Sequence, residues 1–387
     1  MTVATALVSD NDPLPILAED AVRQALDKSG LTHANGVLVF LTPEFARHAR
    51  QTITAVARTA QCTQVAGGIA AGVFTESGWV LDRPAAAVMV FGGGLSLGHP
   101  EPGRQPVLSY AGGSFPTDWS SDGVRFGGSY SGNTGSAEAP VWQQGRLAEP
   151  QRCSVQLLGA DIDIGVSCGL QLLGEPMMVD SSNGFDLERL GGQAALTSLN
   201  RHLPTDQRFH TGLQLHHVTA VLMDGDHSAN SALVDGRYRP IAIIAANTDN
   251  SLTLAERVAP GQHLAWAIRQ PINALTDMRQ TIERLARKAE NVADPVCALM
   301  FSCIGRGPYF YGGEDCDLDV LRERFPDLPV LGTYGTGQIA PIANGEGEGG
   351  GGGGEFGLNS QNCQMQNAVV TALVSRQMKD ADVQSVT

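Results

Sequence analysis

Hydrophobic residues recur along the first part of the chain with two periods, one helical and one extended. Apolar residues at positions 21, 22, 25 and 26 share one face of a helix predicted over residues 18–28. Residues 36–42 (GVLVFLT) are a nearly continuous apolar run, which is typical of a strand buried on both faces. A second helix is predicted over residues 43–60, and residues 65–72 (VAGGIAAG) predict a strand that breaks into small residues. This order of elements is typical of an α/β protein.

The same order of elements returns near the end of the chain. A helix predicted over residues 276–290 is followed by a buried strand at 296–303 (VCALMFSC) and a short helix at 318–325. The next strand, in residues 329–337 (PVLGTYGTG), again ends in glycines. We therefore expect a mixed α/β (α+β) fold with two related domains, each a mixed β-sheet core flanked by helices. Two unrelated β-α-β stretches in one protein are the alternative interpretation of this pattern.

The repeat also predicts the domain limits. The first domain takes residues 18–184, and the second takes residues 185–377. Residues 345–357 (GEGEGGGGGGEFG) are of low complexity, and we expect a mobile loop there.

Charge and cysteine content exclude several classes of partner and compartment. The 387 residues include 26 Lys and Arg against 40 Asp and Glu, which gives a net charge of −14. Nucleic acids and anionic membranes attract basic surfaces, so we expect neither as a partner. The N-terminus has no recognisable signal peptide, and no apolar run approaches the ~20 residues of a transmembrane helix. Seven cysteines without a CxxC pair are predicted to be free thiols of a cytoplasmic protein.

Candidate chemistry gathers where the second buried strand ends. Residues 302–307 (SCIGRG) place Cys303, Arg306 and Gly307 in a glycine-flanked turn, and ligands of α/β proteins collect at such strand ends. Arg306 suits a carboxylate or phosphate, and its charge would lower the pKa of the Cys303 thiol. A small buried thiol beside a surface arginine is the alternative interpretation. No histidine lies nearby in the sequence to act as a base, so we expect no catalysis by Cys303.

Other motifs point away from catalysis and from bound cofactors. The glycines of residues 92–98 precede Pro100 and Pro102, which prevent the helix that a dinucleotide site needs. Residues 224–227 (DGDH) are expected to form a polar turn rather than a metal site. His216 and His217 are adjacent and would point to opposite faces of a strand, so each is only a weak candidate for a haem ligand. Apart from that haem, we expect no metal, no cofactor and no enzymatic activity.

Two C-terminal motifs resemble those of the FIST proteins, which are bacterial sensory proteins with paired FIST-N and FIST-C domains. Residues 298–307 (ALMFSCIGRG) are similar to the family's strand end and the turn after it. Residues 328–341 (LPVLGTYGTGQIAP) are similar to its later glycine-rich motif, except that Gln338 stands where the family usually has glutamate. Weaker similarities at residues 37–74 and 164–176 extend the resemblance over most of residues 18–375. The predicted domains are thus FIST-N-like and FIST-C-like.

The resemblance implies that the protein senses a small ligand, amino-acid-like or a small acid, and signals through a separate partner protein. The acidity of the chain suggests that this partner has a basic face. If the two C-terminal strands pair, their ends form a polar pocket. Its candidate ligand-binding residues are Cys303, Arg306, Gly307, Gly335, Gly337 and Gln338. Two alternatives remain: an interaction subunit of a larger assembly without a small ligand, and a haem-binding nitric oxide sensor.

Overall fold

The computed structural model describes residues 2–101, 105–130, 138–204, 215, 218–223, 238–290, 293–342 and 361–377. The chain divides into two compact units. Unit 1 combines Met1–Ser167, Met278–Pro341 and Leu358–Thr387. Unit 2 combines Cys168–Asp277 and Ile342–Gly357. The expected mobile loop at residues 345–357 lies outside the described residues.

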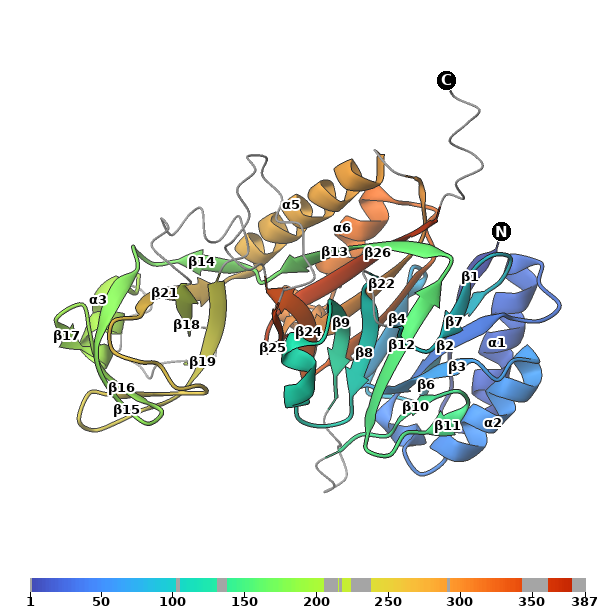
Figure 1. Ribbon diagram of the computed structural model, residues 1–387, viewed down its shortest axis with the longest axis horizontal. Helices are drawn as coiled ribbons and strands as arrows, with labels where there is room; N and C mark the ends of the chain where they lie inside the picture. The colour runs from blue at the N-terminus through green and yellow to red at the C-terminus, as the bar shows by residue number, and fades with distance from the viewer. Residues whose placement is uncertain are drawn as a thin grey trace. The chain divides into compact units, whose positions relative to one another are not determined.

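The first sheet of unit 1 is built around a parallel pair of strands, β2 and β3. The pairing continues antiparallel on both sides of this pair. In spatial order its strands are β1 (Val3–Ser9), β6 (Ala85–Phe91), β2 (Gly36–Leu41), β3 (Val65–Ile69), β10 (Val141–Gln143) and β11 (Arg146–Leu147) (Figure 1).

The second sheet of unit 1 repeats this arrangement. Its central pair, β22 and β23, is parallel, and its other pairs are antiparallel. In spatial order its strands are β13 (Ala160–Ser167), β26 (Val369–Arg376), β22 (Pro295–Cys303), β23 (Val330–Gly335), β4 (Gly72–Thr75) and β5 (Gly78–Leu81). The mixed α/β fold is therefore confirmed, and its two sheets share one order of parallel and antiparallel pairs. The strands β4 and β5 follow β3 in the chain but complete the second sheet, so the two halves of unit 1 are interleaved.

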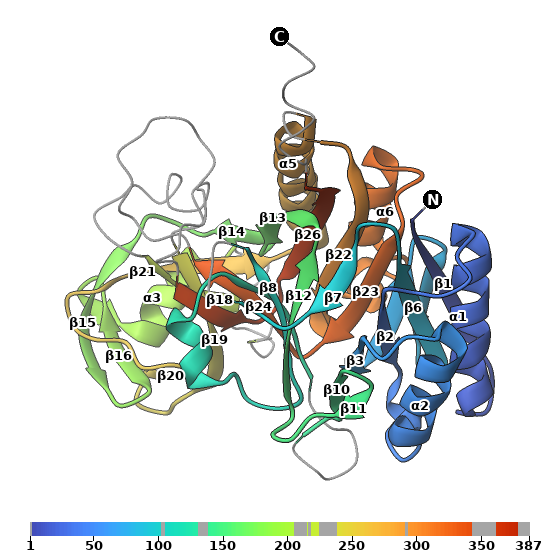
Figure 2. The ribbon, with the colours of Figure 1, turned by 45° about the vertical axis from the view of Figure 1, so that its right-hand side comes forward.

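Helices cover the outer faces of these sheets. Figure 2 shows α1 (Pro15–Ser29) and α2 (Ala49–Ala60) side by side, and α1 contacts β1 and β6 while α2 contacts β3 and β11. The second half of α5 (Pro271–Glu290) packs on β13, where a Cβ at Gly165 would lie 2.8 Å from the Leu285 side chain. Figure 2 shows α6 (Cys316–Arg324) on the same side of this sheet. Each helix buries an apolar face, such as Met278, Ile282 and Leu285 of α5, and this burial supplies most of its stability.

A third sheet completes unit 1 and brings further side chains into the space between the first two. In spatial order its strands are β25 (Gln361–Met365), β24 (Gly337–Ile342), β9 (Arg125–Ser129), β8 (Val107–Ala111), β12 (Arg152–Leu158) and β7 (Ser96–Gly98). The shared core is aromatic: the Phe40 ring centroid lies 5.5 Å from that of Tyr110 and 6.2 Å from that of Phe301. Phe126 of β9 meets Phe301 of β22 at 6.4 Å. A short 3-10 helix, η2 (Thr117–Ser121), lies against β25.

Unit 2 contains a closed antiparallel barrel. An additional pairing of β18 with β21 closes the row of described strands from β21 to β18 into a ring. Its strands are β21 (His263–Arg269), β15 (Met177–Asn183), β16 (Asp186–Leu190), β20 (Leu252–Leu254), β19 (Tyr238–Ala246) and β18 (Val218–Met223). β14 (Leu170–Leu172) pairs with β21, and β17 (Gln193–Ala194) with β16. Buried Leu, Val and Ile side chains together with Trp266 and Leu199 of α3 (Ala195–His202) form its core.

The predicted limits of the FIST-N-like and FIST-C-like domains, residues 18–184 and 185–377, stay a prediction. The compact units follow a different division, because residues 184 and 185 lie at the turn between β15 and β16.

The predicted helix at residues 43–60 is two elements rather than one. A 3-10 turn, η1 (Pro43–Phe45), comes first, and α2 begins only at Ala49. Phe45 N–H donates to the Thr42 carbonyl and Ala46 N–H to the Pro43 carbonyl, which are the short-range bonds of a 3-10 turn. Apolar spacing does not distinguish such a turn from the first turn of an α-helix.

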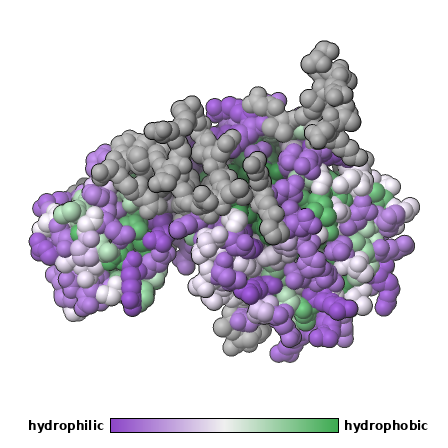
Figure 3. Space-filling view, in the orientation of Figure 1, coloured by the Kyte–Doolittle hydropathy of each residue, from purple (hydrophilic) through white to green (hydrophobic). Residues whose placement is uncertain are grey.

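Polar and apolar residues are mixed both on the surface and in the helices. On the face drawn in Figure 3, hydrophilic residues are interspersed with smaller hydrophobic areas. Among the described residues, no helix is long and apolar enough to cross a membrane.

Candidate ligand site

The candidate site lies at the carboxyl ends of two parallel strands of unit 1. Cys303 closes β22 and is the register neighbour of Gly335 at the end of β23. The chain leaves β22 through two 3-10 turns, η5 (Ile304–Arg306) and η6 (Pro308–Tyr311). The strands of the two motifs, residues 298–307 and 328–341, therefore pair as the predicted pocket requires.

Arg306 is an internal side chain with its guanidinium fully engaged. It is 1% exposed. Its Nε and Nη2 donate to the two carboxylate oxygens of Asp317, each at 2.9 Å. Its Nη1 donates to the Ser167 carbonyl at 2.9 Å, and Nη2 to the Ser167 hydroxyl at 2.8 Å. Arg306 thus binds a carboxylate, but the carboxylate belongs to Asp317 of the same chain. These hydrogen bonds connect η5 to α6 and β13.

A second buried acid stands beside this ion pair. Asp315 caps α6 by accepting a hydrogen bond from Leu318 N–H at 3.0 Å, and it also accepts one from the Tyr334 hydroxyl. Burial raises the pKa of Asp315 to about 6, against the lowering effect of the Tyr334 hydrogen bond. Burial, followed by the negative charge of Asp315, raises the pKa of Tyr334. Tyr311 donates to Asp317 at 2.9 Å, so two tyrosines and one arginine satisfy the two carboxylates.

Cys303 has no base beside it among the contacts described. Its thiol is 5% exposed, and its sulfur lies 3.8 Å from the side-chain oxygen of Asn367. Arg306, which the sequence suggested as an activating charge, is committed to Asp317 and Ser167. All seven cysteines of the chain are free thiols, as predicted.

The glycines of the site allow close approach to other parts of the protein. A Cβ at Gly335 would lie 2.8 Å from the Ser129 carbonyl oxygen, and one at Gly337 would lie 2.4 Å from the Gln364 side chain. A Cβ at Gly307 would lie 3.3 Å from the Tyr334 ring. The contact at Gly335 is with backbone and excludes a side chain, whereas those at Gly337 and Gly307 are with side chains that would have to shift.

Gln338 is the residue of the site whose polar atoms find no partner. It is 0% exposed in β24, and neither its Oε1 nor its Nε2 has a hydrogen bond within the part of the chain that the structure describes. It is the register neighbour of Gly128 in β9, which in turn is the neighbour of Tyr110 in β8. Register neighbours share a face of the sheet. The Tyr110 hydroxyl is also buried without a described partner.

Tyr130 and Thr333 complete this polar group, which we call the Gln338 cluster (Tyr110, Gly128, Tyr130, Thr333 and Gln338). A Cβ at Gly128 would lie 2.7 Å from the Tyr130 hydroxyl, so this hydroxyl fills the space above the glycine. That hydroxyl is 3.0 Å from the Thr333 hydroxyl. Burial raises the pKa of both Tyr110 and Tyr130, so both remain protonated.

Sequence reasoning identified Gln338 but missed the two tyrosines and the threonine. Each lies in or next to a strand that reads as apolar, such as β8 (VLSYA). Tyrosine in a fully buried strand is the signal that was available, because its hydroxyl usually needs a partner there.

Two other predictions concern groups beyond this site. His216 and His217, the weak haem candidates, lie outside the described residues. Across the described ranges, no three His, Cys, Asp or Glu side chains are grouped closely enough to hold a metal ion.

Comparison with known proteins supports the resemblance drawn from the motifs. The FIST C domain family matches residues 195–341, a span that contains all six candidate site residues. An uncharacterized protein of Mycobacterium tuberculosis (strain H37Rv) is 28% identical over 222 residues, or 56% of each chain. An uncharacterized protein of Mycobacterium bovis is 29% identical over 181 residues, which are 46% of this chain and 45% of that protein. The chain thus spans about half the length of the curated relatives it matches. The match to the FIST C domain model at residues 195–341 confirms the resemblance of this chain to the FIST family.

Proposed function

We propose that this chain is a sensory protein that binds a small ligand at the Gln338 cluster and signals through a separate partner protein. The FIST C domain implies a sensory or signal-transduction family. The ligand, the partner and a cytoplasmic location belong to the proposal. Binding without chemical turnover is also part of it.

The observation that carries the proposal is the buried, unpartnered amide of Gln338. A buried polar group without a hydrogen bond lowers the stability of a protein by about 1–3 kcal/mol, so most buried polar groups have a partner. An amide offers one acceptor and two donor hydrogens, and Tyr110 adds a hydroxyl on the same face. A ligand group with both a donor and an acceptor would satisfy the Gln338 amide.

The charges around the cluster narrow the class of ligand. The five residues of the Gln338 cluster include no cation, and Arg306, the arginine that the sequence suggested for the site, is bonded to Asp317. An ionised carboxylate buried there would lack a counter-charge. The group that enters is therefore a carboxamide or a carboxylic acid that takes up a proton on binding.

Arg306 has a positioning role in this proposal rather than a contact with the ligand. Its bonds to Asp317 and Ser167 hold the turns that follow β22. The partner protein is expected to present a basic face to this acidic chain of net charge −14.

Isothermal titration calorimetry with small amides and the matching acids tests the proposal. We expect saturable binding of an amide, and binding of its acid that takes up about one proton per site, seen by comparing buffers of different ionisation enthalpy. The variant Gln338→Leu should abolish binding, and the exposed variant Glu44→Gln should retain it. Equal binding by Gln338→Leu and the unchanged protein would overturn the proposal.

A further inference from the structure

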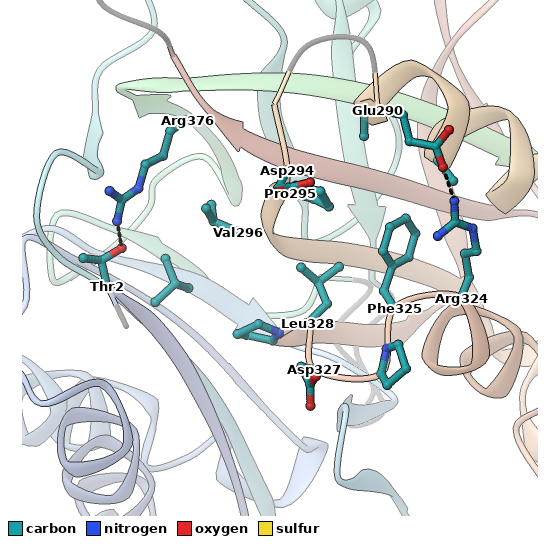
Figure 4. Close-up of a pocket in the computed structure, with 15 residues that line it drawn as sticks. Thr2, Glu290, Asp294, Pro295, Val296, Arg324, Phe325, Asp327, Leu328 and Arg376 are labelled. Atoms are coloured by element: carbon teal, nitrogen blue, oxygen red, sulfur yellow. Dashed lines mark hydrogen bonds and ion pairs between the residues drawn. The ribbon is translucent and has the colours of Figure 1, made fainter.

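A cavity lies where β22 and β23 begin, opposite the strand ends that carry Cys303 and Gly335. It encloses about 620 Å³, a volume within the usual range for small-molecule sites. Figure 4 shows it between the ends of α5 and α6, the loop from Phe325 to Leu328 and the first residues of the chain. Its floor is apolar, formed by Val3, Ala286, Ala289, Val296, Phe325 and Leu328.

The cavity lining carries three acids, Glu290, Asp294 and Asp327, against two arginines, Arg324 and Arg376. Asp294 and Asp327 are exposed on the rim, and neither carboxylate has a hydrogen bond or ion pair with any residue in the described ranges. Two helices also end at the cavity, α5 at Glu290 and α6 at Arg324. The last carbonyls of a helix carry partial negative charge and attract cations.

The two arginines of the cavity offset this charge only in part. Arg324 donates to Glu290 at 2.5 Å and lies 3.5 Å from Glu283, and its guanidinium is 5.1 Å from the centroid of the Phe325 ring. Its charge is thus paired. Arg376 donates to the Thr2 hydroxyl at the other end of the cavity, as Figure 4 shows. The two rim carboxylates remain available between these two ends.

We propose that this cavity binds an organic cation, a molecule with an apolar body and an ammonium group. The apolar body would lie on the floor formed by Val296, Phe325 and Leu328, where burial of its surface favours binding. The ammonium group would pair with Asp294 or Asp327. This site is separate from the Gln338 cluster and does not depend on the function proposed for it.

Three probes of one size and different charge test this proposal. 2-Phenylethylamine is cationic at pH 7, 3-phenylpropionate is anionic, and 2-phenylethanol is neutral. Ligand-observed NMR titrations of the full chain should show saturable binding of the amine, with an affinity at least about tenfold above that of the acid. Equal affinity for the amine and the acid, or no saturable binding of the amine, would contradict the proposal.

Matched variants place the binding in this cavity. The double variant Asp294→Asn/Asp327→Asn should lower the affinity for the amine about tenfold and leave the affinity for the alcohol unchanged. The control Asp12→Asn/Glu44→Gln removes two exposed acids elsewhere in unit 1 and should leave both affinities unchanged. Ala289→Leu, which adds bulk to the floor, should weaken all three probes. If Ala289→Leu does not fold, the two double variants decide. An equal loss of affinity for the amine in both of them would show that the amine does not bind in this cavity.

Discussion

The guanidinium of Arg306 and the carboxylate of Asp317 form a two-bond ion pair in which both side chains are shielded from water. Their side chains are 1% and 0% exposed, and each of the two bonds is 2.9 Å long. Such a pair contributes little net stability compared with apolar residues, but removing one partner leaves an uncompensated buried charge. The pair joins the turn after β22 to α6, so it holds the end of the strand that borders the candidate site.

Arg306→Ala should therefore destabilise the protein by about 3–5 kcal/mol. The loss leaves the Asp317 carboxylate buried without the guanidinium that neutralises its charge, although the Tyr311 hydroxyl still donates to it. Urea unfolding followed by circular dichroism measures the change. Arg322→Ala, which removes an exposed arginine paired with Asp319, should cost less than about 1 kcal/mol. Similar losses for the two variants would contradict the role assigned to the buried pair.

Stability should depend on the ionisation of Asp315. Because its folded pKa of about 6 lies above its ordinary value of 3.8, the folded state favours the neutral carboxyl. Its stabilising contribution is complete below pH 3.8 and is lost as the pH rises through about 6. Asp315→Asn stays neutral, so its stability relative to the unchanged protein should rise between pH 4 and pH 7, by roughly 2–3 kcal/mol at about 1.4 kcal/mol per unit. A difference that does not vary with pH would exclude this ionisation.

The Tyr334 hydroxyl should hold the pKa of Asp315 down. It donates a hydrogen bond to that carboxylate, which favours the charged form. Tyr334→Phe should therefore move the carboxyl midpoint above about 6, a shift that carbon-13 NMR of labelled aspartate can follow. An unchanged midpoint would show that the hydrogen bond does not act on the ionisation.

Gly127 should tolerate no side chain. Its φ of +147° disfavours other residues, and a Cβ would lie 1.9 Å from the Ser109 carbonyl oxygen of the neighbouring strand. Gly127→Ala should cost more than about 2 kcal/mol through strain and lost pairing. Gly94→Ala, where a Cβ meets nothing within 4 Å, is the matched control and should have little effect. Thermal unfolding of the two variants gives the comparison.

Much of unit 1 follows from its apolar pattern. The runs at residues 36–42 and 296–303 are strands β2 and β22 because a strand covered on both faces must be apolar throughout. The interleaving of β4 into the second sheet was not predictable, because apolar patterns do not name a strand's partner. The barrel of unit 2 was missed for the same reason, since its closure rests on the pairing of β18 with β21.

The pairing of the strand ends at the candidate site was predictable, and the partners of its side chains were not. The paired strand ends at Cys303 and Gly335 follow from two motifs of similar form. The internal partner of Arg306 could not be read from the sequence, because Asp317 is one of several acids in the segment that follows it. Tyr110, Gly128 and Gln338 are neighbours across three strands, β8, β9 and β24. This arrangement could not be predicted because β24 is far from the other two strands in the sequence.

Gln338→Leu should leave the ligand-free protein at least as stable as before. The change removes two polar atoms that lack described partners, so no hydrogen bond is lost. Asn362 of the adjacent strand β25 is the control, because its side chain bonds Arg125 N–H and the carbonyls of Trp119 and Gly123. Asn362→Leu should cost at least about 2 kcal/mol by the same unfolding measurement.

Native mass spectrometry of the unchanged protein and of Gln338→Leu, purified side by side from their own cells, tests the central claim most directly. We predict that the unchanged protein carries one small molecule per chain, which is released on denaturation, and that Gln338→Leu carries none. Two proteins of bare mass, or two that carry the same molecule in equal amount, would contradict ligand binding at Gln338.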